Sequence, residues 1–268
     1  MRNLTLILLA VIATSASAQK LPGKQETSVW LPDNLKIDGK ATEWDYTYRA
    51  YNHTTDLYYT IANNKEFLYL TIHSDIGGVI NTIVKYGFTF TIAATDKKDD
   101  QKNSVAINFP MEIPVSDYKK MTMILLKDGQ KPDTSTQVEA AFMQGNNNTL
   151  QQRHKSIVVK GVEGLDTLSV YNEANLKVAE AFDNKRTYTL EIAIPLRYLK
   201  SVKGGKLSYH LAITGYKNSK KAAMAAAYDP PGGYSADILQ AIAELNARIA
   251  SRDASTDFWG EYTLAKAP

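Results

Sequence analysis

Apolar and polar residues alternate with a period of two along much of the chain, and this pattern predicts β-strands. In each stretch one set of side chains is apolar and the intervening set is more polar, which is typical of a strand with one face on a core. Turn-forming residues, for example at 62–65 and 203–206, separate the stretches. The alternating stretches are residues 57–62, 67–73, 86–93, 188–194 and 207–213.

One segment near the C-terminus has a clear helical period. In residues 237–251 the apolar side chains recur on one face, and Asp237 can cap the first turn with Gln240 in capping-box position. We therefore expect an amphipathic helix that packs on the rest of the fold. Three other segments are interpreted as a short helix over 79–85, a helix or a buried strand within 111–128, and a long loop over 128–152.

Many short strands and one late helix predict a mostly β protein, an antiparallel β-sandwich or jelly-roll with one amphipathic helix in the C-terminal region. No internal repeat, linker or change of composition divides the chain, so residues 19–268 are expected to form a single β-sandwich domain. Domains of this class often take ~200–250 residues. The surplus should lie in loops and in the helix, where insertions commonly shape a binding surface.

The first residues have the organisation of a secretory signal peptide. Arg2 supplies a short positive region, residues 4–14 are apolar but too few to cross a bilayer, and residues 16–18 form a small-residue cleavage site. Residues 1–18 are therefore expected to be a signal peptide, which predicts a secreted protein, periplasmic or extracellular. An exported chain without cysteine is also typical of bacteria.

Charge and cysteine content narrow the classes of partner and chemistry. The net charge is +3, with 31 Lys+Arg against 28 Asp+Glu, and this balance argues against a nucleic-acid partner. Without cysteine the chain has no disulfide framework, no cysteine nucleophile and no thiolate metal site. The apolar runs after the leader are all short, so membrane insertion is not expected.

Sequence signatures of catalysis and metal binding are missing. There is no G-x-S-x-G elbow, H-E-x-x-H motif, P-loop or G-x-G-x-x-G loop. The four histidines lack metal-ligand spacing, and the acidic cluster at 96–100 lacks the alternation and the pivot glycine of a calcium loop. No catalytic residue, metal ligand or cofactor is therefore assigned, and a divergent glycan-active enzyme is the least favoured interpretation.

Four short segments carry motifs that occur together in one known family. Residues 35–44 contain I-D-G followed by E-W, residues 66–75 form an L-Y strand that ends in an aspartate, and residues 188–195 read Y-x-x-E-x-x-I-P. Residues 258–264 then provide a closing strand. In this order the segments resemble the family 9 carbohydrate-binding module, within the wider DOMON-like group of β-sandwich domains. The resemblance implies a β-sandwich and a carbohydrate ligand.

The motifs themselves are expected to have structural roles. Asp38 and Gly39 would form a turn in which glycine supplies a backbone conformation that other residues resist. Pro195 would end its strand. Trp44 and Trp259, from the opening and closing segments, are expected to be largely buried near the ends of the sandwich.

Aromatic side chains give the main indication of a ligand, because sugar rings stack on Tyr and Trp while nearby polar groups bind the hydroxyls. Tyr228 and Tyr234 flank a turn stiffened by Pro230 and Pro231, and Asp229 could accept hydrogen bonds from a ligand. Tyr228, Asp229 and Tyr234 are therefore the predicted ligand-binding residues.

Other tyrosines lie on the predicted strands. Tyr58 and Tyr69 should face outward, Tyr46 and Tyr48 should share a face with Trp44, and Tyr51 should lie on the opposite face of that run. Strand tyrosines are common in sandwich proteins, so a purely structural role stays open for each of them.

These observations predict a secreted, non-catalytic, carbohydrate-binding-like module for a glycan or a similar small ligand. The alternative is a cell-envelope module for protein interaction or assembly, which uses the same sandwich for a protein partner and binds no sugar. A groove lined by outward aromatic residues would favour the glycan, whereas a broad, flat apolar patch would favour the protein partner.

Overall fold

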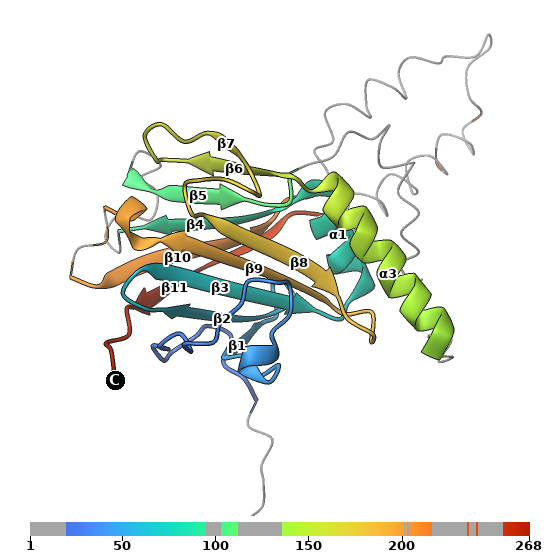
Figure 1. Cartoon of the computed structure of the whole chain (residues 1–268), viewed down its shortest axis with the longest axis horizontal. Coiled ribbons are helices and arrows are strands. Elements are labelled where there is room, and N and C mark those ends of the chain that lie inside the picture. Colours follow the sequence, from blue (N-terminus) through green and yellow to red (C-terminus); the bar gives the residue numbers. More distant parts are fainter. Residues whose placement is uncertain are drawn as a thin grey trace, which may run out of the picture.

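The computed structural model describes residues 20–94, 103–111, 136–200, 202, 204–215, 235, 240 and 254–268. Over this part of the chain, two antiparallel sheets of five and six strands pack on a shared apolar core (Figure 1). Two α-helices lie at one end of the strands. The predicted mostly β, sandwich-like fold is therefore confirmed.

The five-stranded sheet has the strand order β1-β2-β3-β9-β8, with antiparallel neighbours throughout. Its register aligns Tyr51, Tyr58 and His73 in one row across β1, β2 and β3. The strands are β1 (Ala50–Asn52), β2 (Leu57–Asn63), β3 (Phe67–Ser74), β8 (Lys177–Phe182) and β9 (Tyr188–Pro195).

The six-stranded sheet has the order β11-β10-β4-β5-β6-β7, again antiparallel. The C-terminal strand β11 therefore lies at the edge of this sheet, beside β10. The strands are β4 (Phe88–Ala93), β5 (Val105–Asn108), β6 (Ser156–Lys160), β7 (Thr167–Ser169), β10 (Lys206–Ile213) and β11 (Thr256–Thr263).

The core consists of the side chains that the period-two pattern assigns to one face of each strand. Tyr59 and Tyr209 join the sheets at its centre: both rings are fully buried, and their hydroxyl groups lie 2.8 Å apart in a hydrogen bond. The predicted core sets are confirmed by burial of Leu57, Ile61, Leu68, Leu70, Ile72, Phe88, Phe90, Ile92, Tyr188, Leu190, Ile192, Ile194, Leu207, Leu211 and Ile213.

The helices agree only in part with the sequence pattern. The short helix expected over 79–85 is confirmed as α1 (Gly77–Tyr86). The long loop expected over 128–152 is wrong, because α3 (Thr136–Arg153) occupies most of it. The buried stripe of α3 includes Asn146 alongside Met143 and Leu150, so the apolar period is interrupted. Two 3-10 turns, η1 (Thr42–Trp44) and η3 (Leu196–Tyr198), complete the described elements.

Several sequence interpretations lie outside the described residues. They are the signal peptide over 1–18, the charged cluster at 96–100 and nearly all of the segment 111–128. The amphipathic helix expected over 237–251 is also outside, apart from the single residue Gln240.

Candidate ligand-binding site

An N-terminal strap, residues 25–44, lies along the edge and outer face of the five-stranded sheet, where outer face means the side away from the core. Its backbone exchanges hydrogen bonds with Asn63 of β2, from Leu31 N–H at 2.9 Å and to the Val29 carbonyl at 3.0 Å. The Gln25 amide group bonds both backbone groups of Ile61, each at 2.7 Å. The strap therefore closes the part of the β2 edge that the short strand β1 leaves unpaired.

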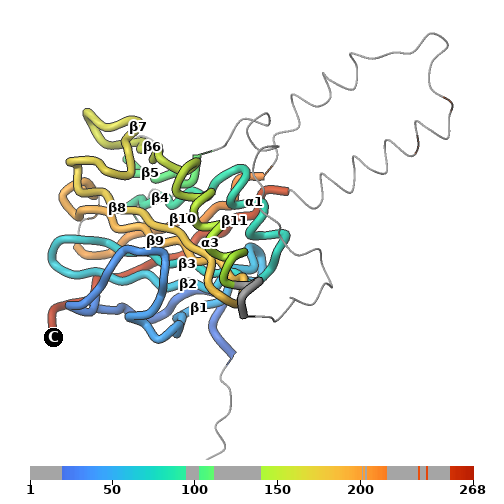
Figure 2. Tube along the Cα trace, turned by 45° about the vertical axis from the view of Figure 1, so that its right-hand side comes forward, coloured from blue at the N-terminus to red at the C-terminus, as the bar shows by residue number. Residues whose placement is uncertain are grey.

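The strap also meets the other end of the chain. The Ser28 hydroxyl donates to the Thr263 carbonyl at 2.5 Å, and the Ala265 N–H donates to Asn63 Oδ1 at 2.7 Å. Figure 2 accordingly shows the blue N-terminal segment running beside the red C-terminal strand. The N- and C-terminal segments thus close the same side of the sandwich.

A second apolar cluster fills the space between the strap and the outer face of the sheet. Tyr69 of β3 points outward as predicted, yet its side chain is fully buried because the strap covers it. Trp44 stacks on the Tyr69 ring, with centroids 5.7 Å apart and planes 20° apart. The remaining members are Val29, Leu31, Leu35, Ile37, Ala62, Phe67 and Ala193.

Glu191, in the middle of β9, fastens the strap to this face. Its Oε1 accepts a hydrogen bond from the Tyr69 hydroxyl at 2.6 Å, and its Oε2 accepts from the backbone N–H groups of Asp38 and Gly39 at 2.8 and 2.7 Å. Gly39 has φ +80°, and a Cβ there would lie 2.5 Å from the Glu180 carbonyl carbon. The predicted need for glycine in this turn is therefore confirmed.

Three of the motif segments identified in the sequence meet at Glu191: residues 35–44, 66–75 and 188–195. Their shared role here is to hold the strap, which agrees with the structural role expected for them. Trp44 and Trp259 are each half-buried rather than largely buried. Trp259 stacks on His210 at 4.6 Å on the opposite sheet, because both side chains belong to the outward set of their strands.

Ionisation of Glu191 should make the stability of the fold depend on pH. Burial raises the pKa of this carboxyl group from 4.5 to about 7, against hydrogen bonds from Tyr69, Gly39 and Asp38 that lower it. Between these pH values the folded chain retains a proton that the unfolded chain has released. The free energy of unfolding should therefore fall by about 3 kcal/mol as pH rises from 4.5 to 7, and this contribution should be absent above that range.

Urea denaturation curves across this pH range would test the expectation. Glutamine stays neutral, so the variant Glu191→Gln should lack this pH-dependent step while the contributions of all other titrating groups remain. Parallel pH profiles for the wild type and the variant would contradict the assignment.

Beyond the strap, aromatic side chains form a continuous row on the outer face of the same sheet. Centroid distances are 4.5 Å between Tyr51 and Tyr58, 5.9 Å between Tyr58 and Tyr48, and 5.0 Å between Tyr48 and His73. His53 extends the row with its ring 4.7 Å from that of Tyr51. We call these five side chains the aromatic row. With strands ~4.8 Å apart, the part across β1 to β3 spans about 10 Å.

Exposure and polar neighbours distinguish the aromatic row from a core. Tyr51, Tyr58 and His73 are half-buried and His53 is exposed, whereas Tyr48 is 7% exposed. The Tyr51 hydroxyl donates to Asp56 at 2.8 Å, and His73 Nδ1 lies 3.1 Å from the Thr189 hydroxyl. The row therefore combines accessible ring surface with fixed polar groups, as ligand-binding surfaces do.

The structure brings together tyrosines that the sequence pattern separated. Tyr48 and Tyr51 were predicted on opposite faces of one extended run. This is wrong because β1 begins only at Ala50. Tyr48 lies before the strand, so the strand alternation does not set its direction, and both rings contact Tyr58. Tyr58 faces outward as predicted. The two histidines were missed as members of the row, because only cross-strand register shows His73 opposite Tyr58.

The predicted ligand-binding residues Tyr228, Asp229 and Tyr234 lie outside the described part of the chain. The structure therefore neither joins them to the aromatic row nor separates them from it. Their turn stays a prediction.

A buried polar group lies inside the sandwich near α3. Glu180 of β8 binds His154 Nδ1 through one carboxylate oxygen and accepts a hydrogen bond from the Tyr188 hydroxyl at 2.5 Å through the other. Both oxygens of the carboxylate are thereby satisfied, and the side chains of His154 and Glu180 are 1% and 5% exposed. This arrangement links α3, β8 and β9 and has no open face in the described structure, so we interpret it as structural.

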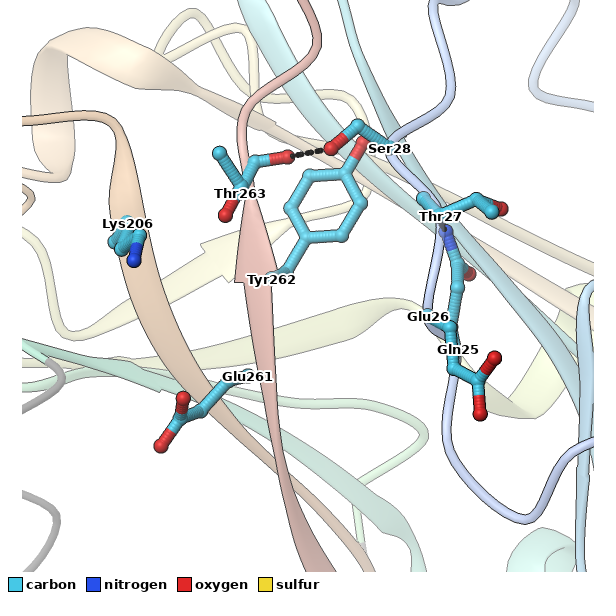
Figure 3. A pocket seen from close by; sticks show the side chains of 8 residues that line it. All are labelled: Gln25, Glu26, Thr27, Ser28, Lys206, Glu261, Tyr262 and Thr263. Atoms are coloured by element: carbon cyan, nitrogen blue, oxygen red, sulfur yellow. Dashed lines mark hydrogen bonds between the residues drawn. The ribbon is translucent and has the colours of Figure 1, made fainter.

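Three depressions elsewhere on the described surface are weaker candidates. One of about 120 Å³ lies between the strap and the ends of β10 and β11, where the Ser28–Thr263 hydrogen bond crosses beside Tyr262 (Figure 3). A second, of about 220 Å³, lies under the strap beside Lys177. The third, of about 560 Å³, is lined in part by Arg197, whose guanidinium already binds the Ala174 carbonyl at 2.7 Å. The first two are smaller than typical ligand sites.

Comparison with family models, with curated proteins and with solved structures finds no match to this chain. Within the described ranges, no three His, Asp or Glu side chains are grouped as they would be around a metal ion. In the same ranges, no helix has the length and apolar content needed to cross a membrane. The candidate site is thus defined by geometry alone: the aromatic row on the five-stranded sheet.

Proposed function

We propose that this protein is an exported, non-catalytic binding module that holds a glycan, or a similar small ligand, on the aromatic row. The observation that carries the proposal is the alignment of half-buried rings across β1, β2 and β3 beside fixed polar groups. Sugar rings present flat C–H faces that stack on such rings, while their hydroxyls donate to carboxylates. The resemblance of the motif segments to the family 9 carbohydrate-binding module supports the same class of ligand.

The length of the row favours an oligosaccharide over a single sugar. Rings from three adjacent strands form a strip about 10 Å long, and Tyr51, Tyr58 and His73 in it are only half-buried. Because the strands beneath it are held by the full hydrogen-bonded ladder of the sheet, the rings are positioned before binding. Such preorganisation lowers the entropic cost of association.

Binding to a panel of immobilised polysaccharides, followed by calorimetry on any that is retained, would test the proposal. Tyr58→Ala removes the central ring and should weaken binding by about 1–3 kcal/mol, the range for aromatic anchors, while the fold is retained with a modest loss of stability from the lost ring contacts. Tyr171→Ala is the matched control, because Tyr171 is 86% exposed on the connection between β7 and β8. The Tyr171→Ala variant should bind the polysaccharide with the same affinity as the wild type.

The same titrations with Tyr228→Ala and Tyr234→Ala would compare the row with the turn predicted from sequence. Loss of binding in these two variants, with Tyr58→Ala unaffected, would move the site to the turn. A protein that binds no polysaccharide would overturn the glycan proposal in favour of the envelope-interaction alternative.

A further inference from the structure

The charges around the aromatic row are strongly one-sided. Asp56 accepts the hydrogen bond from Tyr51. Asp75 and Asp183 directly follow Ser74 of β3 and Phe182 of β8, the two residues paired with Tyr188 of β9, so they lie at the same end of the sheet. Both favour a positive charge on His73. The charged side chains that act most strongly on Tyr46, Tyr48, Tyr51 and His73 are all acidic. The whole chain has a net charge of +3, so this acidic surface is a local feature.

The guanidinium group of Arg186 is held away from the row. Arg186 lies in the same β8–β9 turn as Asp183, but its guanidinium lies over the Phe142 ring of α3, 4.3 Å from the centroid. Burial lowers the pKa of His73 below its usual value, against the opposing effects of Asp183 and Asp75. The imidazole is therefore neutral near pH 7 and does not offset the carboxylates.

Tyr48 provides a second, independent indication that the row receives a polar group. Its side chain is more than nine-tenths buried, yet its hydroxyl makes no well-formed hydrogen bond in the described part of the chain. The neighbouring Thr189 hydroxyl lies 3.1 Å from His73 Nδ1. Thr189 and Asp183 are both close enough to act on the Tyr48 hydroxyl. A buried hydroxyl without a partner costs free energy unless a bound group satisfies it.

Aromatic faces beside carboxylates form the combination that recognises an ammonium group. The rings attract a cation through their π faces, and the carboxylates accept charge-assisted hydrogen bonds from its N–H groups. An acidic or sulfated glycan would instead be repelled by the same carboxylates. A neutral sugar would gain from the rings but would leave the negative charge uncompensated.

We propose that the ligand of the aromatic row carries an ammonium group, as an amino-sugar oligomer does, and that Asp183 and Asp75 are the residues that select it. This inference rests on the proposed function, since it specifies the ligand of the same site.

Calorimetry with three oligomers of equal length would test the inference: glucosamine, N-acetylglucosamine and glucose. At about pH 6, where amines are charged, the glucosamine oligomer should bind at least about tenfold more tightly than the other two, and its affinity should fall as salt is added. Asp183→Asn keeps the Oδ1 acceptor that binds the backbone N–H groups of Lys185 and Thr187. This variant should lose most of the preference for glucosamine and retain the binding of the neutral oligomers.

Asp75→Asn removes the second carboxylate, outside the β8–β9 turn, and should also reduce the preference for glucosamine. Asp166→Asn is the control, because it removes one negative charge away from the row and should leave that preference unchanged. If the neutral oligomers bind as tightly as glucosamine, and Tyr58→Ala weakens all three, the ammonium inference fails while the glycan proposal stands. If only a polyamine such as spermidine binds, with sensitivity to Asp183→Asn, ammonium recognition is supported and the glycan proposal fails. If no probe binds the wild type, both fail.

Discussion

Replacing Glu191 with alanine is expected to lower the free energy of unfolding by about 4 kcal/mol at about pH 5. The substitution removes the acceptor for the Tyr69 hydroxyl and for the N–H groups of Asp38 and Gly39. Each buried donor left without a partner costs about 1–3 kcal/mol. Glu191 is fully buried, and so are its hydrogen bonds with Gly39 and Tyr69. Water therefore cannot replace these two bonds without a cavity or movement of the strap, whereas the bond with Asp38 is only partly buried.

Urea denaturation would measure the loss of global stability, and hydrogen exchange would measure local opening of the strap. Glu191→Gln keeps a carbonyl oxygen for the two backbone amides and should cost only about 1 kcal/mol. Exchange of the Asp38 and Gly39 amides should accelerate in the alanine variant and stay slow in the glutamine variant. Above pH 7 the difference between wild type and alanine should shrink, because the wild type then carries the buried charge. Equal losses in the two variants would show that the hydrogen bonds from the Asp38 and Gly39 amides do not hold the strap.

The sequence pattern correctly predicts the direction of side chains within one strand. It does not predict burial that depends on a second segment of the chain. The alternation at 57–62 and 188–194 correctly separates core-facing from outward side chains, because side-chain direction in a strand follows directly from the pleat. Tyr69 and Glu191 belong to the outward sets, and both are nevertheless buried. Their burial comes from the strap, which has no period of its own and whose position depends on contacts distant in sequence.

The aromatic row illustrates the same limit for the candidate site. Tyr58 could be predicted to face outward. Its neighbours Tyr51 and His73 are set by cross-strand register, and Tyr48 contacts it from the irregular segment before β1. Helix α3 was not predicted for a different reason. Asn146 occupies a buried position on it where the helical pattern would require an apolar residue. Individual side-chain directions are thus local properties, whereas a binding surface is a property of the assembled sheet.

Gly260→Ala is expected to destabilise the protein by about 3 kcal/mol through overpacking. Gly260 of β11 is paired directly with Tyr209 of β10, and the tyrosine ring lies over the glycine. A Cβ at this position would lie 2.2 Å from Tyr209 Cζ and 2.3 Å from its hydroxyl oxygen. The ring is fully buried and its hydroxyl is bonded to Tyr59, so it cannot move aside without disturbing the centre of the core.

A double-mutant cycle with Tyr209→Leu would show whether the ring is the cause. In the leucine background the alanine at position 260 should cost clearly less than in the wild type, since the two residues are in direct contact. Gly145→Ala is the matched control: Gly145 lies on α3, where an added Cβ would meet no neighbouring group within 4 Å, and alanine there should stabilise the helix by about 0.5–1 kcal/mol. A Gly260→Ala variant as stable as the wild type in urea denaturation would show that β11 can shift away from Tyr209, and the tight pairing of β11 with β10 would then not be required for the fold.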